Sequence, residues 1–293
     1  MEQLIRRSSS LVPIALLLLA MASFQSGASI AKTMFPVVGA VGMVTLRIVL
    51  GTLVLAVTLR PWRARVTPES RRPLLVYGIS LGVMNLLFYG ALSRIPLGIA
   101  VALEFSGPLA VALWGSRRVV DYCWIALAVA GLVLLLPPAR LTGGIDPLGL
   151  IYALGAGACW ALYIVFGQKA GADHGAQTVA LGSAISAVVI APLGLLVAGP
   201  VLFAPSVLLP GLGVAVLSTA LPYTLEMFAL TRMATRTFGI LMSLEPAFAA
   251  VFGLVWLREH LTLLQWTAVL LIILASIGTT VTSERQVAPA LPD

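Results

Sequence analysis

The chain has 293 residues, of which 60% are hydrophobic and only 10% are charged, and its mean hydropathy is +1.04. A soluble domain is about 45–50% apolar and about 25% charged, so this composition excludes an ordinary soluble protein. The net charge of +7 does not indicate nucleic-acid binding. The basic residues lie in short connections between apolar segments, where membrane topology explains them.

Ten apolar segments follow one another, and each is long enough to cross a lipid bilayer as a helix. They are expected at residues 11–31, 36–59, 73–93, 96–115, 120–137, 147–168, 177–198, 206–230, 236–257 and 263–282. The predicted fold class is therefore an all-α integral membrane protein with ten transmembrane helices.

The first segment also has features of a cleavable signal peptide. Arg6 and Arg7 precede a leucine-rich run, and small residues follow it at Ala20 and Ala22. The apolar pattern nevertheless continues to Ile30, and removing it would leave the first half of the chain one helix short. We favour a retained first helix.

The distribution of lysine and arginine predicts the orientation in the membrane. With a cytoplasmic N-terminus, 13 of the 18 basic residues face the cytoplasm, four lie outside and Arg47 lies within a segment. The cytoplasmic group is Arg6, Arg7, Arg60, Arg63, Arg65, Arg71, Arg72, Arg117, Arg118, Lys169, Arg232, Arg236 and Arg285. The external group is Lys32, Arg94, Arg140 and Arg258. Both termini are therefore predicted to be cytoplasmic.

A short motif occurs twice, as Gly-Ile-x-x-x-Leu-Glu, and it ends at Glu104 and at Glu245, 141 positions later. The same offset pairs Asn85 with Glu226, so the match extends over several segments. Arg117 and Arg258 form a further pair at this offset.

The repeat predicts two domains, residues 11–137 and 147–282, each with five helices. Since five is odd, the second half is inverted relative to the first, an arrangement that recurs among secondary transporters with a substrate site near the midplane. The connection around Pro137–Pro147 is rich in proline and glycine and forms the natural joint.

Four ionisable residues lie deep in apolar segments: Arg47, Glu104, Glu226 and Glu245. A charge at the bilayer centre costs about 2.5–3.5 kcal/mol on insertion scales, so these residues mark a functional site by default. A structural alternative is that Arg47 pairs with one glutamate and only holds helices together. One arginine cannot neutralise three acids, so at least one carboxyl group is protonated or faces water. Such a group suits a proton-coupled carrier.

Each of these glutamates has a proline within four residues, and a proline inside a helix cannot bond the carbonyl four residues earlier. The carbonyls freed in this way are those of Glu104, Ser218 and Met242, opposite Pro108, Pro222 and Pro246. Free carbonyls at membrane depth are tolerated where they line a cavity or find another partner. A simple packing kink is the alternative for each proline.

Polar and aromatic residues follow the same helical faces. Thr219, Tyr223 and Glu226 share one face at i, i+4 and i+7. Tyr77, Leu81 and Asn85 share another, as do Gln25, Ser29 and Lys32. Trp160 and Tyr163 lie in the middle of their segment rather than at its ends, and core packing remains the simpler explanation for both.

Several stretches resemble the EamA-type branch of the drug/metabolite transporter superfamily. They are MASFQSGASIAK (21–32), IPLGIAVALEFSGPLAVAL (95–113), GAGACWALYI (155–164) and LSTALPYTLEMFALTRMATRTFGILMSLEPA (217–247). The resemblance implies a ten-helix exporter in the bacterial inner membrane. It implies export of small amino acids such as L-threonine and L-homoserine, driven by the proton gradient without a cofactor.

A zwitterionic amino acid needs a cation for its carboxylate and an anion or carbonyls for its ammonium group. Arg47 is the candidate for the first role, and Glu104, Glu226 or Glu245 for the second, with the amino acid and protons as the partners. Asn85 or Tyr223 could reach a side-chain hydroxyl. Trp160 and Tyr163 complete the set of candidate site residues.

Two other classes of protein stay open. A related carrier of drugs or nucleotide sugars would have a wider aromatic or basic cavity. An intramembrane lipid-modifying enzyme would need a reactive cluster near one interface, and the sequence contains neither a Walker A loop nor G-x-S-x-G. Its two histidines and two cysteines have no metal-ligand spacing, so we expect neither an enzyme nor a metal or cofactor.

Overall fold

The computed structural model describes residues 2–113, 119–135, 146–175, 177–230 and 241–283, and within these ranges it contains helices and no strand. The α-helices are α1 (Glu2–Thr33), α2 (Phe35–Leu59), α3 (Pro68–Leu92), α4 (Leu97–Glu104), α5 (Ser106–Leu113), α6 (Val119–Leu135), α7 (Pro147–His174), α8 (Gln177–Ala198), α9 (Pro205–Ala215), α10 (Leu221–Leu230), α12 (Glu245–Leu257) and α13 (Leu263–Ser283). Shorter turns are η1 (Pro61–Arg63), η2 (Gly199–Phe203) and η3 (Val216–Ala220).

Six of the described helical stretches are long and apolar enough to cross a membrane, by length and composition. They are Val12–Thr33, Phe35–Leu59, Pro68–Leu92, Pro147–Gly171, Gln177–Phe203 and Pro205–Glu226. Shorter apolar stretches lie at Leu97–Val111, Tyr122–Gly131, Glu245–Leu257 and Leu263–Gly278. The prediction of an all-α membrane protein is therefore confirmed for the described chain, and the count of ten spans stays a prediction.

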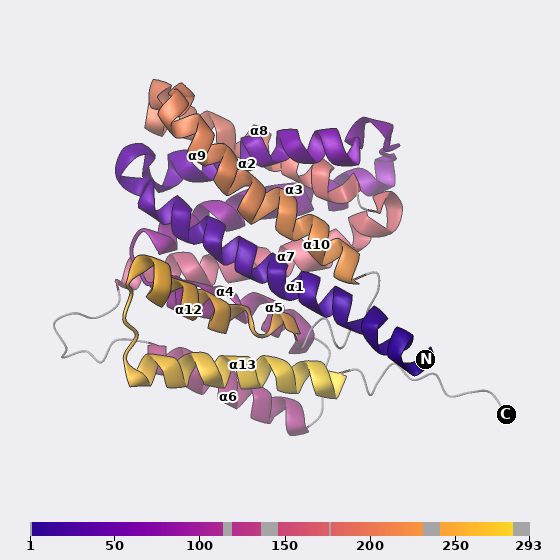
Figure 1. The fold of residues 1–293 in the computed structure, drawn as a ribbon, viewed down its shortest axis with the longest axis vertical. Helices are drawn as coiled ribbons and strands as arrows, with labels where there is room; N and C mark the ends of the chain where they lie inside the picture. The colour runs from indigo at the N-terminus through magenta and orange to yellow at the C-terminus, as the bar shows by residue number, and fades with distance from the viewer. Residues whose placement is uncertain (1, 114–118, 136–145, 176, 231–240, 284–293) are drawn as a thin grey trace.

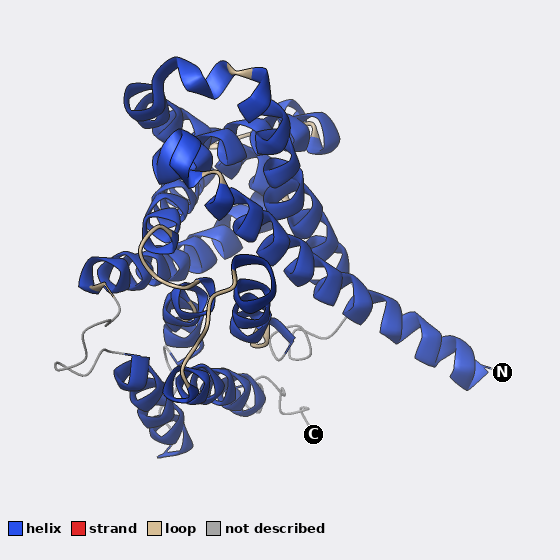
Figure 2. Ribbon diagram, turned by 60° about the vertical axis from the view of Figure 1, so that its left-hand side comes forward, coloured by secondary structure: helices blue, strands red, loops and turns tan. Residues whose placement is uncertain are grey.

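The outer surface of the bundle is apolar. Val57, Leu196 and Leu263 are 73%, 83% and 84% exposed, which is unfavourable in water over so many positions but suits contact with lipid. Helices α6 and α13 lie side by side at one edge, next to the pair formed by α4 and α12 (Figure 1). Helix α1 crosses between α12 and α10 (Figure 1), and its first turns project from the bundle (Figure 2).

Glycines set the closest helix contacts. A Cβ atom on Gly78 would lie 2.6 Å from Cβ of Ile185, so α3 and α8 approach through this position. The backbones of α5 and α7 touch at Gly107 and Gly157, where a Cβ on Gly107 would overlap the carbonyl oxygen of Gly157. Small residues allow this approach in membranes, where close packing supplies much of the association energy.

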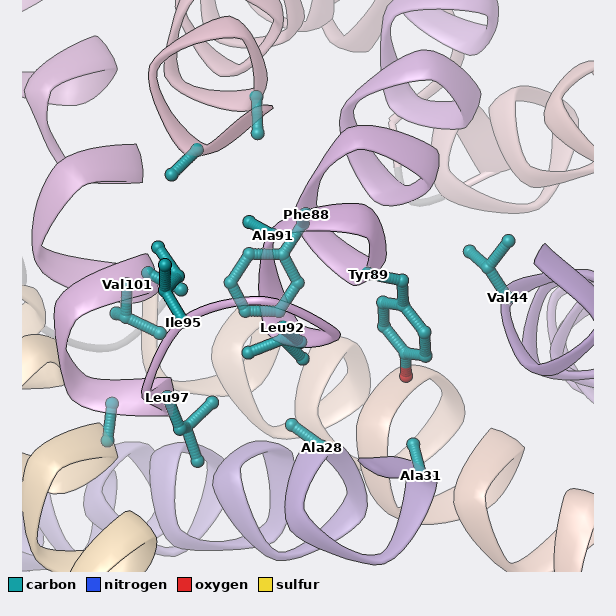
Figure 3. Packing of buried hydrophobic residues seen from close by; sticks show 14 of the residues in the cluster. Ala28, Ala31, Val44, Phe88, Tyr89, Ala91, Leu92, Ile95, Leu97 and Val101 are labelled. Carbon is teal, nitrogen blue, oxygen red and sulfur yellow. The ribbon is translucent and has the colours of Figure 1, made fainter. Parts of the chain in front are cut away.

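The largest buried cluster lies where α1, α2, α3 and α4 meet. Phe88, Tyr89 and Leu97 pack there against Ala28 and Ala31 of α1 (Figure 3). The alanines let large side chains from α3 and α4 approach the α1 backbone. The cluster fixes α1 beside the start of α4.

Polar contacts at the two ends of the bundle differ. Lys32, at the end of α1, forms an ion pair with Glu259, and Arg94 forms one with Asp146 beyond α3. At the opposite end of α2, Nε2 of Gln177 is 3.5 Å from the carbonyl oxygen of Arg60. A second contact at that end joins His174 to the Ser70 hydroxyl at 3.0 Å, and together with the capping box at Thr67 it secures the start of α3.

Three helices are interrupted at the positions where sequence analysis placed prolines and glutamates. The span predicted at 96–115 contains α4 and α5, which are separated by the single residue Phe105, and its apolar stretch runs over Leu97–Val111. Helix α12 begins at Glu245 with proline next to it, and the predicted start of this span at 236–240 lies outside the described residues. A π-turn, η3, separates α9 from α10 just before Pro222.

Candidate functional site

Arg47 of α2 is the largest fully buried side chain, with 2% of its surface exposed. Its guanidinium group donates three hydrogen bonds to neutral acceptors: Nε to Oγ1 of Thr219 at 3.1 Å, Nη1 to Oδ1 of Asn85 at 2.7 Å and Nη2 to the carbonyl of Ser218 at 2.7 Å. Among the described residues no carboxylate forms an ion pair with it. The structural alternative of an Arg47–glutamate pair is therefore not what the described residues show.

The carbonyl of Ser218 is the one that sequence analysis expected Pro222 to free. Residues 216–220 form a π-turn in which the N–H of Leu221 bonds back to Val216, one residue further than in an α-helix. Thr219 and Ser218 thereby present a hydroxyl and a carbonyl to Arg47 from consecutive positions. The freed carbonyl thus serves as an acceptor for a buried cation.

Aromatic rings flank Arg47, and a second hydrogen bond fixes its partner Asn85. Its guanidinium carbon lies 4.9 Å from the ring centre of Phe24 and 5.5 Å from that of Tyr89, within cation–π range. Asn85 also donates from Nδ2 to the carbonyl of Leu81 at 2.7 Å, which fixes its amide so that Oδ1 faces Arg47. These contacts fix the position of the guanidinium group, and a small cavity adjoins it.

That cavity lies between α2, α3, α8, η3 and α10. The residues lining it combine one cation with hydroxyl and amide groups: Arg47, Ile48, Leu81, Asn85, Ser183, Ser186, Thr219 and Tyr223. Sequence analysis predicted Arg47, Asn85 and Tyr223 as site residues, and the structure places all three on this cavity.

Glu104 and Glu245 lie at the inner ends of a pair of antiparallel helices. Gly98 of α4 contacts Ala250 of α12, and Leu97 lies opposite Gly253, so residue numbers rise along α4 as they fall along α12. This pairing brings the last residue of α4, Glu104, level with the first residue of α12, Glu245. Each is 7% exposed, and the two carboxyl groups are close enough to interact electrostatically.

The remaining predicted residues surround the cavity and the acidic pair. Glu226, on α10, is half-buried and lies within electrostatic range of Glu245 and of Tyr163. Tyr163 of α7 stacks on Tyr77 with 4.7 Å between ring centres. Trp160 contacts Phe105 edge-on at 5.5 Å, directly after Glu104. Both aromatic residues of α7 therefore have packing partners beside the acids.

Several buried polar atoms have no hydrogen-bond partner among the described residues, although most buried polar groups in proteins are paired. They belong to Gln25, Ser29, Thr52, Tyr89, Trp124, Ser186 and Glu245. Both amide atoms of Gln25 are included, and that side chain is fully buried. Ser186 is also one of the residues that line the cavity.

Sequence analysis missed four residues that shape the site. Ser183 and Ser186 share a face of α8 at i and i+3, a spacing visible in the sequence but common in membrane helices. Phe24 and Tyr89 read as ordinary apolar residues, because only the fold brings their rings to Arg47.

A family model described as EamA-like transporter family matches residues 147–281. The "Threonine/homoserine exporter RhtA" of Escherichia coli (strain K12) is 56% identical over 282 residues, covering 96% of each chain. The protein of the same name from Salmonella typhimurium (strain SL1344) is 58% identical over 275 residues, which is 94% of this chain and 93% of that one. The chain belongs to the EamA-like transporter family.

Family membership gives the class of activity. This EamA-like chain is a multi-pass membrane transporter and not an enzyme, since its relatives are exporters. A solved crystal structure of another protein aligns with 97% of the chain and 99% of its own, with a TM-score of 0.61 and 20% identity. At that identity the likeness shows the fold alone.

Proposed function

We propose that this EamA-like transporter exports L-threonine and L-homoserine across the bacterial inner membrane in exchange for protons. The observation that carries the proposal is the identity of 56–58% over nearly the whole chain to exporters named for these two amino acids. The polar cavity beside Arg47 supports it, because a buried cation flanked by hydroxyl and amide groups suits a small hydroxylated zwitterion.

The helix contacts support two inverted five-helix repeats, residues 11–137 and 147–282. A twofold axis between the halves would relate α1 to α7, α2 to α8, and α3 to α9 and α10. The counterpart of the pair α1–α10 is then α3–α7, and the counterpart of α2–α9 is α3–α8. All four pairs are in contact. The pairs α2–α8, α4–α12 and α6–α13 would each lie across the axis, and they are in contact as well.

The ends of the bundle support cytoplasmic termini. Lys32 and Arg94, which belong to the sparse basic group, lie at one end in ion pairs with acids. Arg60 lies at the other end, with the basic connections that follow it. The positive-inside rule places this second end in the cytoplasm.

Arg47 binds the carboxylate of the amino acid in this mechanism. Guanidinium and carboxylate match as a two-point pair, and a buried cation gains from an anionic partner because its present acceptors are neutral. Asn85 and Tyr223 line the same cavity and can bond the substrate hydroxyl. A substrate carboxylate would displace one of the acceptors that Arg47 has now.

The three glutamates supply the coupling. A proton and the substrate ammonium group compete for one of Glu104, Glu226 and Glu245. Binding of the proton therefore releases the amino acid, and binding of the amino acid releases the proton. Glu104 and Glu245 are both buried at facing ends of α4 and α12, so a proton bound by one of them lies within reach of the proposed coupling path. Of the three glutamates, Glu226 is the fewest residues away from a residue that lines the cavity, and it is two helical turns from Thr219.

The test reconstitutes the protein in vesicles, imposes a pH gradient and follows labelled threonine and homoserine. Gradient-driven flux is expected in the wild type and is expected to fall about tenfold or more in at least one of Glu104→Gln, Glu226→Gln and Glu245→Gln. Full gradient-driven flux in all three variants would refute proton coupling through these acids. Glu69→Gln, on the first turn of α3, is the matched control.

A second measurement tests the substrate. Cells that overproduce the chain are expected to accumulate threonine and homoserine in the medium. Resistance to toxic drugs without amino-acid release, or transport of nucleotide sugars by the vesicles, would instead assign the chain to another branch of the drug/metabolite superfamily.

A further inference from the structure

The ion pair between Lys32 and Glu259 joins three separate parts of the chain. Nζ of Lys32 lies 2.6 Å from Oε1 of Glu259 and also donates to the carbonyl of Ile95 at 3.0 Å. The second carboxylate oxygen, Oε2, accepts from the N–H of Leu97 at 2.7 Å. The contact therefore ties the end of α1 to the start of α4 and to the turn after α12. We call it the latch.

The latch lies at one end of a polar stripe on α1. Gln25, Ser29 and Lys32 share a helical face at i, i+4 and i+7. Met21, one turn before Gln25 on this face, packs in a cluster with Phe248 of α12. Contacts with α12 and the turn after it therefore lie at both ends of the stripe, and α1 packs against α12 between them.

Helix geometry gives the distance that the polar stripe covers from the latch toward the acids. Seven residues separate Lys32 from Gln25, and seven separate Leu97 from Glu104, which is about 10 Å along a helix in both cases. Starting from the latch, Ser29 comes about halfway to Gln25, and Gln25 is as many residues from Lys32 as Glu104 is from Leu97. The seam between α1 and the α4–α12 pair thus leads from the latch to the acidic pair.

Polar atoms along this seam lack partners. Both amide atoms of Gln25, Oγ of Ser29 and Oε2 of Glu245 are buried and have no hydrogen bond within the described part of the chain. Apolar residues would close such a seam more stably, because unpaired buried polar groups are unfavourable. Their presence makes sense if the seam is wet or occupied in another conformation of the protein.

We propose that this seam is the release route to the outside, that the latch is its external gate, and that Gln25 and Ser29 are the polar groups met by the departing ligand. Opening the latch frees α1 from α4 and α12 and lets water reach Ser29, Gln25 and then Glu245. The route fits a small ligand with hydrogen-bonding groups. That this ligand is the exported amino acid rests on the proposed function.

Cysteine labelling in whole cells tests the gate without reference to substrate. Cys123 and Cys159 are replaced by alanine, Ser29→Cys is introduced, and a membrane-impermeant maleimide is added from outside. With the latch intact we expect slow labelling. Lys32→Ala or Glu259→Gln is expected to speed labelling about tenfold, since each weakens a charge-assisted contact that holds one of two states.

Glu259→Gln keeps a group that can accept from Leu97 and removes only the charge, so it covers the case in which Lys32→Ala does not fold. Asp146→Asn is the matched control, because it breaks the other ion pair at the same end without touching the seam. Its labelling rate is expected to equal that of the intact latch.

Equal labelling in the intact protein and in the folded latch variants would overturn the proposal. Labelling of Ser29→Cys only in inside-out vesicles would overturn it as well, since the route would then open to the cytoplasm. The result is separable from the proposed function: latch-dependent labelling without threonine export would support the gate and refute the substrate.

Discussion

Two buried polar regions of this transporter differ in how completely they are hydrogen-bonded. Every nitrogen of the Arg47 guanidinium has an acceptor and Asn85 is fixed by a second bond, while Oη of Tyr89 and Oγ of Ser186 nearby have no partner among the described residues. Along the seam beside α1, Gln25 and Glu245 have buried atoms without partners in the described structure. Polar groups that have hydrogen-bond partners hold one conformation, whereas buried polar groups without partners favour a conformation in which they gain them. We therefore regard the surroundings of Arg47 as the binding site and the seam beside α1 as the part that changes conformation.

Arg47→Met should have the largest effect on export and stability, because it leaves the hydrogen-bond acceptors around residue 47 without their donor. Asn85, Ser218 and Thr219 each lose a donor, at about 1–3 kcal/mol for each buried group left unpaired. We expect export to fall at least about 100-fold and thermal stability in detergent to fall with it. Arg47→Lys is the control, since it keeps the charge but not the forked geometry; full export by this variant would contradict the proposed role.

Leucine substitutions in the two regions should change the folding stability in opposite directions. Gln25→Leu removes an amide that has no partner, so the folded protein should gain about 1 kcal/mol while export slows. Asn85→Leu removes an amide that Arg47 uses, so stability should fall by about 1–3 kcal/mol. Melting temperatures of the two purified variants give the comparison. Destabilisation of similar size in both would mean that the two regions do not differ.

Thr219→Val tests one acceptor of Arg47 at nearly constant shape. It removes the hydroxyl that accepts from Nε, and about 1 kcal/mol corresponds to roughly a fivefold loss of export. Thr224→Val is the matched control, because among the described residues that hydroxyl donates only to the carbonyl of Ala220, one turn earlier. Export rates at equal membrane abundance decide the outcome, and equal rates in both variants would count against Thr219.

The smallest effect concerns Asp146, outside the membrane-spanning helices. Its hydrogen bond from Arg94 and the backbone N–H of Leu148 hold the pKa of this carboxyl below its ordinary value. The stabilisation is therefore present above the unfolded pKa, about 3.9, and is lost as pH falls through the folded value. Asp146→Asn should flatten the acid side of a melting-temperature profile by a small amount, and an unchanged profile would contradict this.

Much of this arrangement could be predicted from the sequence. Composition indicated the membrane class, and the glutamate–proline pairs marked places where helices break, as they do at Phe105 and Glu245. Pro222 indicated a free carbonyl at Ser218. Which group would bind that carbonyl could not be predicted, because Arg47 lies 171 positions away and only the packing of α2 against η3 joins them.

The latch and the aromatic contacts show the same limit. Glu259 lies in a connection and gives no local signal that its carboxylate reaches Lys32 and Leu97. Tyr89 is indistinguishable in sequence from a core tyrosine. Local pattern predicts which backbone groups become free, whereas the choice of partner depends on contacts between distant helices.

The contact between Gly107 and Gly157 leaves no room for a side chain. With no side chain between them, α5 and α7 meet backbone to backbone. The end of α4 meets the same place, because a Cβ atom on Gly157 would lie 2.7 Å from the carbonyl oxygen of Glu104. A single methyl group at residue 157 would therefore push α7 away from both halves of the interrupted helix, next to the carboxyl-bearing residue Glu104.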